Sequence, residues 1–161
     1  MAVLEPGSSF PSVSLRDAGG RPAAVPGGET LWAFFKTTCP TCELMWPYLD
    51  RLAERSNGDG RVIAVSQDDV AETESFNERL GVRIRTLYDG PPWKASEALG
   101  LSNVPTLLLV DREGRIRETV EGFQKAKMEE LAERFTDRRP SGVPAESFFR
   151  PGESVPALRP G

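Results

Sequence analysis

The stretch Leu31-Trp-Ala-Phe-Phe-Lys-Thr-Thr-Cys-Pro-Thr-Cys-Glu-Leu-Met-Trp-Pro-Tyr-Leu49 decides the fold, because an apolar run changes there into a helical pattern. Residues 31–35 are almost continuously apolar and follow a Pro-Gly-Gly turn signal, which predicts a strand buried on both faces of a sheet. From Cys42 onward, apolar residues recur at steps of three and four, which predicts a helix with one buried face. The chain's only two cysteines therefore lie at the junction of a strand and a helix.

The position of each cysteine predicts a different chemical role. Cys39 lies at the helix start, where unpaired backbone N–H groups and the positive end of the helix dipole stabilise a thiolate. We therefore expect Cys39 to be the more nucleophilic sulfur. Cys42 lies one turn further along the same face, so it can close a disulfide onto Cys39 and release whatever Cys39 has captured. Pro40 is tolerated in the first helical turn, where its missing N–H costs nothing.

These features together resemble a known superfamily. A buried strand, C-P-T-C at a helix start and a later Val104-Pro105-Thr106 before an apolar strand resemble the thioredoxin superfamily. The stretch from Gly7 to Pro11 and an extra helical segment before the last strands are similar to its TlpA/ResA-like redoxin branch, over roughly residues 5–136. The resemblance implies an α/β fold, a thioredoxin-like three-layer sandwich. Its mixed central sheet is flanked by helices, with an N-terminal β-hairpin and a Pro-rich C-terminal tail.

The resemblance also assigns roles to individual residues. Cys39 matches the attacking cysteine and Cys42 the resolving one. Pro105 matches the proline that is cis in this superfamily and faces the cysteine pair, where the backbone of Val104 pairs with an extended substrate. The substrate groove is then expected to comprise Thr38, Pro40, Thr41, Val104 and Pro105.

Four positions depart from the pattern of the family. Thr38 stands where relatives carry a tryptophan, and Ala33 where many place a buried acid or amide. Met45 replaces the glutamate of ResA-like members, and the acid that is present, Glu43, is displaced by two residues. Deprotonation of Cys42 is therefore expected to rely on water, on the substrate, or on Glu43 if this side chain turns inward.

The remaining pattern divides the chain into a domain and a tail. A thioredoxin-like domain is expected over residues 1–136, opening with a β-hairpin around the turn at 16–20. Further strands are predicted at 62–65, within 82–88, at 106–110 and at 115–120. Further helices are predicted from Asp68 or Asp69 to Leu80, at 95–99 and at 124–135.

Residues 137–161 are rich in proline and glycine and show neither a helical nor a strand period. This composition is typical of a flexible tail. Phe148, Phe149, Val155 and Leu158 are more apolar than a solvated linker needs, so docking along the domain or onto a partner is the alternative.

Composition excludes several classes of function. The chain has 161 residues, 39% of them hydrophobic, with 20 basic against 24 acidic residues and no histidine. With neither a basic stripe nor interleaved aromatics, we expect no nucleic-acid partner. No stretch approaches 18 apolar residues, so no stable membrane insertion is expected, and Met1 to Glu5 lacks the features of a signal peptide. The chain as written is expected to be cytoplasmic and monomeric, or extracytoplasmic if a leader was removed.

Three functions remain open at this stage. The first is a thiol–disulfide oxidoreductase that acts on protein disulfides and exchanges electrons with an upstream thiol reductant or oxidant. The second is a peroxiredoxin-like thiol peroxidase with Cys39 peroxidatic, prompted by the C-P-T sequence, although Lys36 and Trp32 replace the residues that peroxiredoxins place there. The third is a redox-inactive binding module. No cofactor is expected, and a closed zinc site is excluded because it needs four Cys or His ligands.

Overall fold

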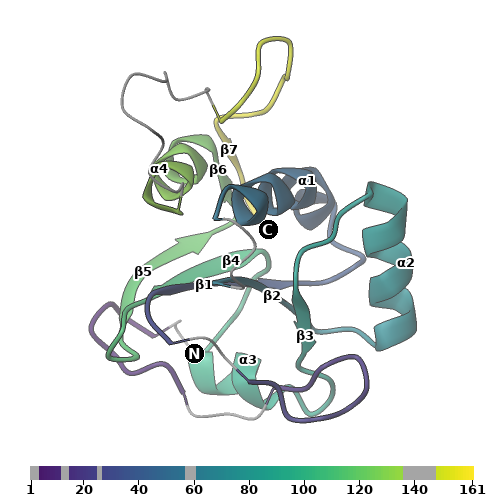
Figure 1. Ribbon diagram of the computed structural model, residues 1–161, viewed down its shortest axis with the longest axis vertical. Coiled ribbons are helices and arrows are strands. Elements are labelled where there is room, and N and C mark those ends of the chain that lie inside the picture. Colours follow the sequence, from purple (N-terminus) through teal and green to yellow (C-terminus); the bar gives the residue numbers. More distant parts are fainter. Residues whose placement is uncertain (1–3, 12–14, 25–26, 57–60, 136–147) are drawn as a thin grey trace.

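The computed structural model describes residues 4–11, 15–24, 27–56, 61–135 and 148–161. At its centre is a five-stranded mixed sheet with the strand order β3-β2-β1-β4-β5 (Figure 1). Strands β1, β2 and β3 are parallel, and β4 is antiparallel to β1 and β5, so the central sheet is mixed, as expected. The strands are β1 (Thr30–Phe35), β2 (Val62–Ser66), β3 (Thr86–Tyr88), β4 (Thr106–Val110) and β5 (Ile116–Glu121).

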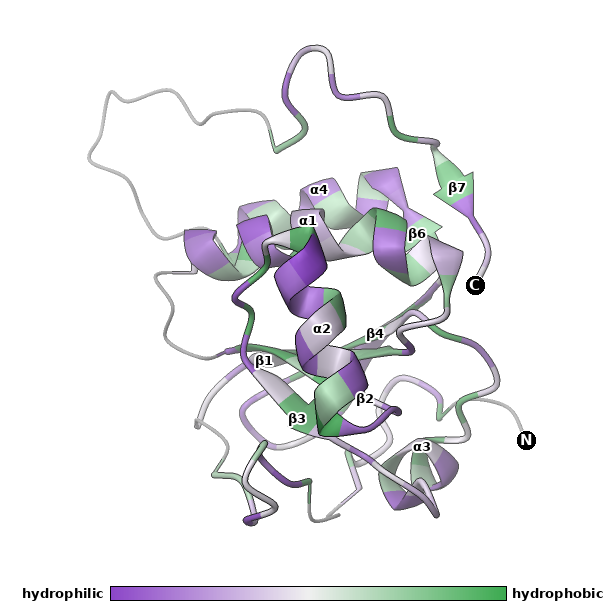
Figure 2. Cartoon of the chain, turned by 90° about the vertical axis from the view of Figure 1, so that its right-hand side faces the viewer, coloured by the Kyte–Doolittle hydropathy of each residue, from purple (hydrophilic) through white to green (hydrophobic). Residues whose placement is uncertain are grey.

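Helices cover both faces of this sheet, which gives the predicted three layers. Figure 2 shows α1 and α4 on one side of the sheet and α3 on the other. The alternation along β1 explains this division: Leu31, Ala33 and Phe35 join the core under α1 and α4, whereas Trp32 and Phe34 join the core beside α3. The helices are α1 (Pro40–Arg55), α2 (Val70–Leu80), α3 (Lys94–Leu99) and α4 (Lys125–Phe135).

The predicted limits of the second helix are confirmed by its caps. The Asp69 carboxylate accepts the backbone N–H of Glu72 at 2.8 Å, which satisfies a free donor of the first turn. At the other end Gly81 has a left-handed backbone with φ of 68°, where glycine carries no steric penalty. Among the described residues, no helix is both long and apolar enough to cross a bilayer.

The N-terminal hairpin is smaller than the sequence predicted. The Asp17 N–H donates to the Arg21 carbonyl at 2.9 Å, and the Ala23 N–H donates to the Leu15 carbonyl at 3.0 Å. Arg16 forms isolated bridges to Pro22 and to Tyr88 at the end of β3, but no extended strand pair forms among the residues described here. Part of the expected hairpin, at 12–14 and 25–26, lies outside the described residues.

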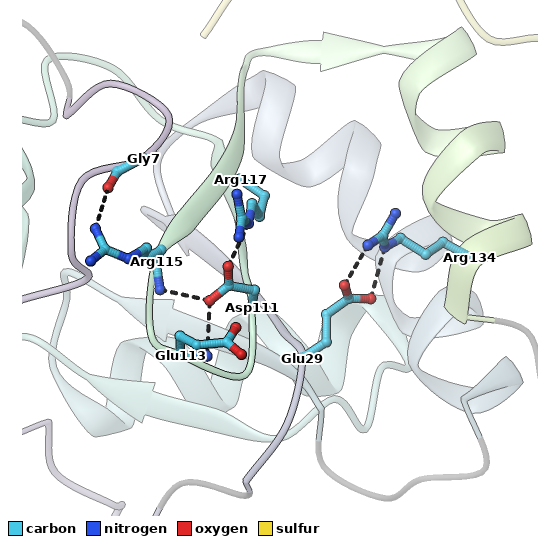
Figure 3. Close-up of polar contacts among 7 residues, drawn as sticks. All are labelled: Gly7, Glu29, Asp111, Glu113, Arg115, Arg117 and Arg134. Atoms are coloured by element: carbon cyan, nitrogen blue, oxygen red, sulfur yellow. Dashed lines mark hydrogen bonds and ion pairs between the residues drawn. The ribbon is translucent and has the colours of Figure 1, made fainter.

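One end of the sheet is closed by charged side chains of the β4–β5 turn (Figure 3). The Asp111 carboxylate accepts the Arg115 N–H at 2.9 Å and pairs with Arg117, and these contacts hold the pKa of Asp111 below its usual range. Glu29, just before β1, pairs with Arg134 of α4 at 2.5 Å. Because β1 starts at this end and runs toward Cys39, the charged turn and the cysteines lie at opposite ends of the sheet.

A second, two-stranded sheet was not predicted. It pairs β6 (Phe123–Gln124) with β7 (Leu158–Arg159), as Figures 1 and 2 both show. The expectation that residues 137–161 contain no strand is therefore wrong for this part of the tail. Phe148 and Phe149 are buried, at 5% and 8% exposure, so the docked alternative describes residues 148–161. We call these residues the docked segment; the part of the tail before residue 148 lies outside the described residues.

Candidate active site

The two cysteines meet at the end of β1, where the chain turns into α1. Cys39 is the N-cap of α1, and its sulfur accepts the backbone N–H of Cys42 at 3.1 Å. The Cys39 thiol also donates to the carbonyl oxygen of Val104 at 3.4 Å. Both cysteines are free, Cys39 partly exposed and Cys42 buried. The structure thus brings together three of the residues that the sequence assigned to the site.

Cys42 lies behind Cys39 in an apolar environment. Its side chain is fully buried, and this burial, followed by the neighbouring Cys39 sulfur, raises the pKa of the Cys42 thiol far above its usual value. Cys42 therefore stays a neutral thiol at physiological pH. Negative charge placed on the Cys39 sulfur, in contrast, is favoured by the N–H of Cys42 and by the helix start.

The loop before β4 faces the cysteine pair. The Val104–Pro105 peptide bond is cis, as predicted, and Val104 reaches the Cys39 thiol through its carbonyl. Pro105 is buried, and its carbonyl accepts the N–H of Gly122 at 2.8 Å. The start of β4 is therefore linked to the turn that follows β5, directly beside the thiols.

The other predicted groove residues differ in exposure. Thr38 and Pro40 are exposed on either side of Cys39. Thr41 is buried, and its hydroxyl donates to the carbonyl of Pro160 at 2.7 Å. The central threonine of the C-P-T-C motif thus contacts the docked segment, a residue pair that sequence reasoning did not connect.

The structure also shows the position of the Glu43 carboxylate. Glu43 is exposed and forms an ion pair with Arg79 of α2 at 2.5 Å, so it does not turn inward toward Cys42. Ala33 and Met45, at the positions where relatives carry acids, are fully buried apolar side chains. Of the three proton acceptors expected for Cys42, water and the substrate remain.

A cavity of about 460 Å³ opens on the α3 side of the Val104 loop. Trp93 lies at its wall with 44% of its surface exposed, and its indole N–H donates to the carbonyl of Gln67 at 2.9 Å. Trp93 therefore lies outside the core, whereas Trp46 is fully buried in it. The lining includes Lys36, Gln67, Trp93, Ser96, Asn103 and Val104.

Within the described ranges of the chain, no group of three or more His, Cys, Asp or Glu side chains is arranged to hold a metal ion.

Comparison with known proteins identifies the family. The model of the redoxin family matches residues 5–134. No curated protein matches the sequence significantly.

Solved structures share the thioredoxin-like fold. The thioredoxin domain of a thiol-disulfide oxidoreductase from Bacteroides vulgatus is 21% identical, with a TM-score of 0.68 over 83% of this chain and 99% of that one. A thioredoxin-family thiol:disulfide interchange protein from Chlorobium tepidum is 19% identical, with a TM-score of 0.64 over 83% and 98%. StoA from Bacillus subtilis is 19% identical, with a TM-score of 0.61 over 75% and 93%. At these identities the likeness is one of fold.

Proposed function

Since the chain belongs to the redoxin family, we propose that it is a thiol–disulfide oxidoreductase that acts on disulfides of proteins. Cys39 attacks the substrate, and Cys42 resolves the intermediate. The observation that carries this proposal is the arrangement of the two sulfurs: Cys39 is partly exposed at the helix start and accepts the N–H of Cys42, whose own thiol is buried behind it. One reachable and one protected thiol fit the two successive steps of disulfide exchange.

The reaction balances with two sulfurs and no cofactor. The Cys39 thiolate attacks one sulfur of the substrate disulfide, and the other substrate sulfur leaves as a thiolate. Cys42 then loses its proton and attacks Cys39, which forms the Cys39–Cys42 disulfide and releases the second substrate thiolate. The substrate has gained two electrons and two protons. Because Glu43 pairs with Arg79 on the surface, the proton of Cys42 goes to the leaving thiolate or to water.

The partners follow from this chemistry. An upstream thiol reductant returns the pair to the dithiol, or an upstream oxidant drives the cycle in the opposite direction. The proposed groove for the protein substrate comprises Thr38, Pro40, Thr41, Val104 and Pro105. The carbonyl of Val104, which already contacts the Cys39 thiol, supports the placement of an extended substrate backbone beside the sulfurs.

A trapping experiment tests the assignment of the two cysteines. Cys42→Ala removes only the resolving step, so the mixed disulfide of Cys39 should accumulate on a disulfide-containing protein such as insulin, and dithiothreitol should release it. Cys39→Ala should trap nothing. The products are resolved on non-reducing gels and by mass spectrometry.

The same variants separate the reductase from a peroxidase. A peroxidase would consume hydrogen peroxide rapidly, and in Cys42→Ala its Cys39 would accumulate as a sulfenic acid open to overoxidation. Lys36 occupies the position where a peroxiredoxin places a hydroxyl, so we expect peroxide consumption at the rate of an ordinary thiolate. Fast peroxide turnover without trapped protein partners would overturn the proposed function.

A further inference from the structure

The docked segment begins with two buried aromatic residues. Phe149 packs against Tyr48 of α1 with ring centroids 5.0 Å apart, and against Phe123 of β6 at 6.2 Å. Phe148 packs against Phe149 at 5.0 Å, and the guanidinium of Arg55 lies 5.2 Å above the Phe148 ring. These contacts fix the start of the segment against α1 and β6.

An ion pair holds the next part of the segment. Arg51 of α1 binds Glu153 through two parallel contacts of 2.8 and 2.7 Å, and its guanidinium also donates to the carbonyl of Phe148 at 2.7 Å. The backbone N–H of Arg150 donates to the same carboxylate at 2.7 Å. Arg51 and this N–H lower the pKa of Glu153 to about 2, so the carboxylate is charged at neutral pH. Bidentate geometry of this kind fixes the orientation of the partner as well as binding it.

The last five residues of the segment, 157–161, are bound in a different way. Their side chains are exposed, including that of Leu158 at 65%, and their contacts are made by the backbone. The Lys125 N–H donates to the Ala157 carbonyl at 3.0 Å, β7 pairs with β6, and the Thr41 hydroxyl donates to the Pro160 carbonyl. This is how a sheet edge binds an extended peptide, with main-chain hydrogen bonds that do not select side chains.

Two glycines allow the segment to approach the site this closely. A Cβ atom on Gly161 would lie 1.9 Å from the carbonyl oxygen of Val104, the atom that also accepts the Cys39 thiol. A Cβ atom on Gly122 would lie 2.6 Å from the carbonyl oxygen of Arg159. Real Cβ atoms do not approach other atoms this closely, so a side chain at either position would force the segment or the backbone facing it to shift. The backbone of Gly161 therefore fills the space in front of Val104, where we have placed the substrate.

We propose that residues 157–161 are an internal ligand of the substrate groove, and that a protein disulfide reaches Cys39 only after these residues leave it. This proposal rests on the proposed function for the identity of the substrate that competes with residues 157–161. Release does not require the whole segment to leave, because the aromatic and ionic anchors at 148–153 use different residues from the backbone contacts at 157–161. The groove of this protein thus selects for substrates that bind more tightly than its own segment.

A matched pair of substitutions tests the internal ligand. Gly161→Val places a side chain where the Val104 carbonyl lies, whereas Ser154→Val adds bulk at an exposed position of the docked segment that lies outside residues 157–161. We expect Gly161→Val to raise the rate at which a bulky maleimide alkylates Cys39 in the reduced protein about tenfold, because the competent fraction of the groove rises. Ser154→Val should react like the unmodified chain. A chain shortened to end at Pro156 should match Gly161→Val.

The enzymatic readout tests the same competition. The KM for insulin disulfides should fall about tenfold in Gly161→Val with kcat unchanged, because an internal competitor reduces only apparent affinity. A synthetic peptide of residues 155–161 should restore the higher KM and slow alkylation in the shortened chain, and a peptide of scrambled order should not.

The outcomes separate this inference from the proposed function. Equal alkylation rates in the unmodified chain, Gly161→Val and the shortened chain would overturn the internal ligand, whatever their activity. Faster alkylation of Cys39 in both variants, with no reduction of insulin by any of them, would overturn the proposed function and leave the internal ligand standing. Circular dichroism of each variant confirms that the fold is retained.

Discussion

The two ends of β5 are closed in different ways. At its start, the turn that contains Gly114 is held by the Asp111 side chain of the same turn, through the Arg115 N–H and Arg117 (Figure 3), and by backbone hydrogen bonds with residues 7–10. At its end, the turn at Gly122 is covered by the docked segment, which comes from far along the chain. The two glycines have nearly the same backbone, with φ of 77° and 74°. The ends therefore differ in what covers them rather than in their local conformation.

This difference bears on which end can open. The contacts of Asp111 lie within one turn, so they do not depend on the docked segment. A turn covered by a separate segment can be uncovered while β5, β4 and β1 stay paired, and such local openings require less free energy than unfolding. The cysteines lie at the end that the docked segment can uncover, and the charged turn lies at the opposite end.

The largest difference between the two ends should appear in the free energy of unfolding when buried side chains are shortened. Ile116, at the start of β5, is fully buried, and Ile116→Ala should lower the free energy of unfolding by about 3 kcal/mol. Phe149→Ala removes a larger buried side chain but should cost about 2 kcal/mol or less, because the loss cannot exceed the free energy that docks the segment. Urea unfolding of both variants measures the two losses.

The opposite ranking would contradict the comparison. If Phe149→Ala cost as much as Ile116→Ala or more, the segment would unfold only with the rest of the protein. A lower m-value for Phe149→Ala is the independent sign of prior undocking, because less surface is then exposed at the transition.

The charged end and the cysteine end also differ in how far the sequence predicted them. Local periodicity and side-chain chemistry predicted the strand before Cys39, the helix after it and the cap at Asp69. Residues close together in sequence carry all of these signals. All of these contacts join residues close in sequence, or strands long enough to show a pattern.

The cover of the active site could not be predicted in this way. β7 has two residues, too few for a strand period, and its partner β6 is equally short. The binding of β7 depends on the absence of a side chain at Gly122 and Gly161. A glycine in a loop, however, is first interpreted as part of a turn. Only the apolar side chains of the tail indicated docking, and one of the four, Leu158, is exposed in the structure. The sequence also left open whether the Glu43 side chain points outward, because its partner Arg79 lies on another helix.

The second prediction concerns alkaline pH at the cysteine end. The folded pKa of Cys42 is raised, so its contribution to stability is complete below the thiol's ordinary pKa of about 8.5 and is lost as the pH rises above it. Between about pH 9 and 10.5, the reduced protein should lose about 1.4 kcal/mol per pH unit more than Cys42→Ala. Urea unfolding under reducing conditions measures both slopes.

The other end supplies the control for this slope. The pKa of Asp111 is lowered, so its contribution is present above its ordinary value and is lost as the pH falls through the acid range. Asp111→Asn should therefore leave the loss of stability of the reduced protein at alkaline pH unchanged. It should alter only the pH dependence of stability in the acid range. Equal alkaline slopes for the unmodified chain and Cys42→Ala would show that Cys42 is not protected in the folded state.

The smallest predicted effect compares the two glycines directly. Alanine at a left-handed φ costs about 1 kcal/mol, so Gly114→Ala and Gly122→Ala should lower the free energy of unfolding by similar amounts. Around Gly114 a Cβ atom meets nothing within 4 Å, whereas at Gly122 it meets the Arg159 carbonyl at 2.6 Å. Only Gly122→Ala should therefore displace residues 157–161 and speed the alkylation of Cys39.

Because backbone strain is matched between these two variants, any difference in alkylation reports the contact with the docked segment. The added conflict at Gly122 is relieved by moving a segment that is bound through a few exposed backbone contacts, so it should add little to the loss of global stability. Gly122→Ala in the chain shortened to Pro156 should then react no faster than that shortened chain itself, because the residues it would displace are gone. If Gly114→Ala sped alkylation as much as Gly122→Ala, strain in β5 would govern access to Cys39, and the two ends would not be independent.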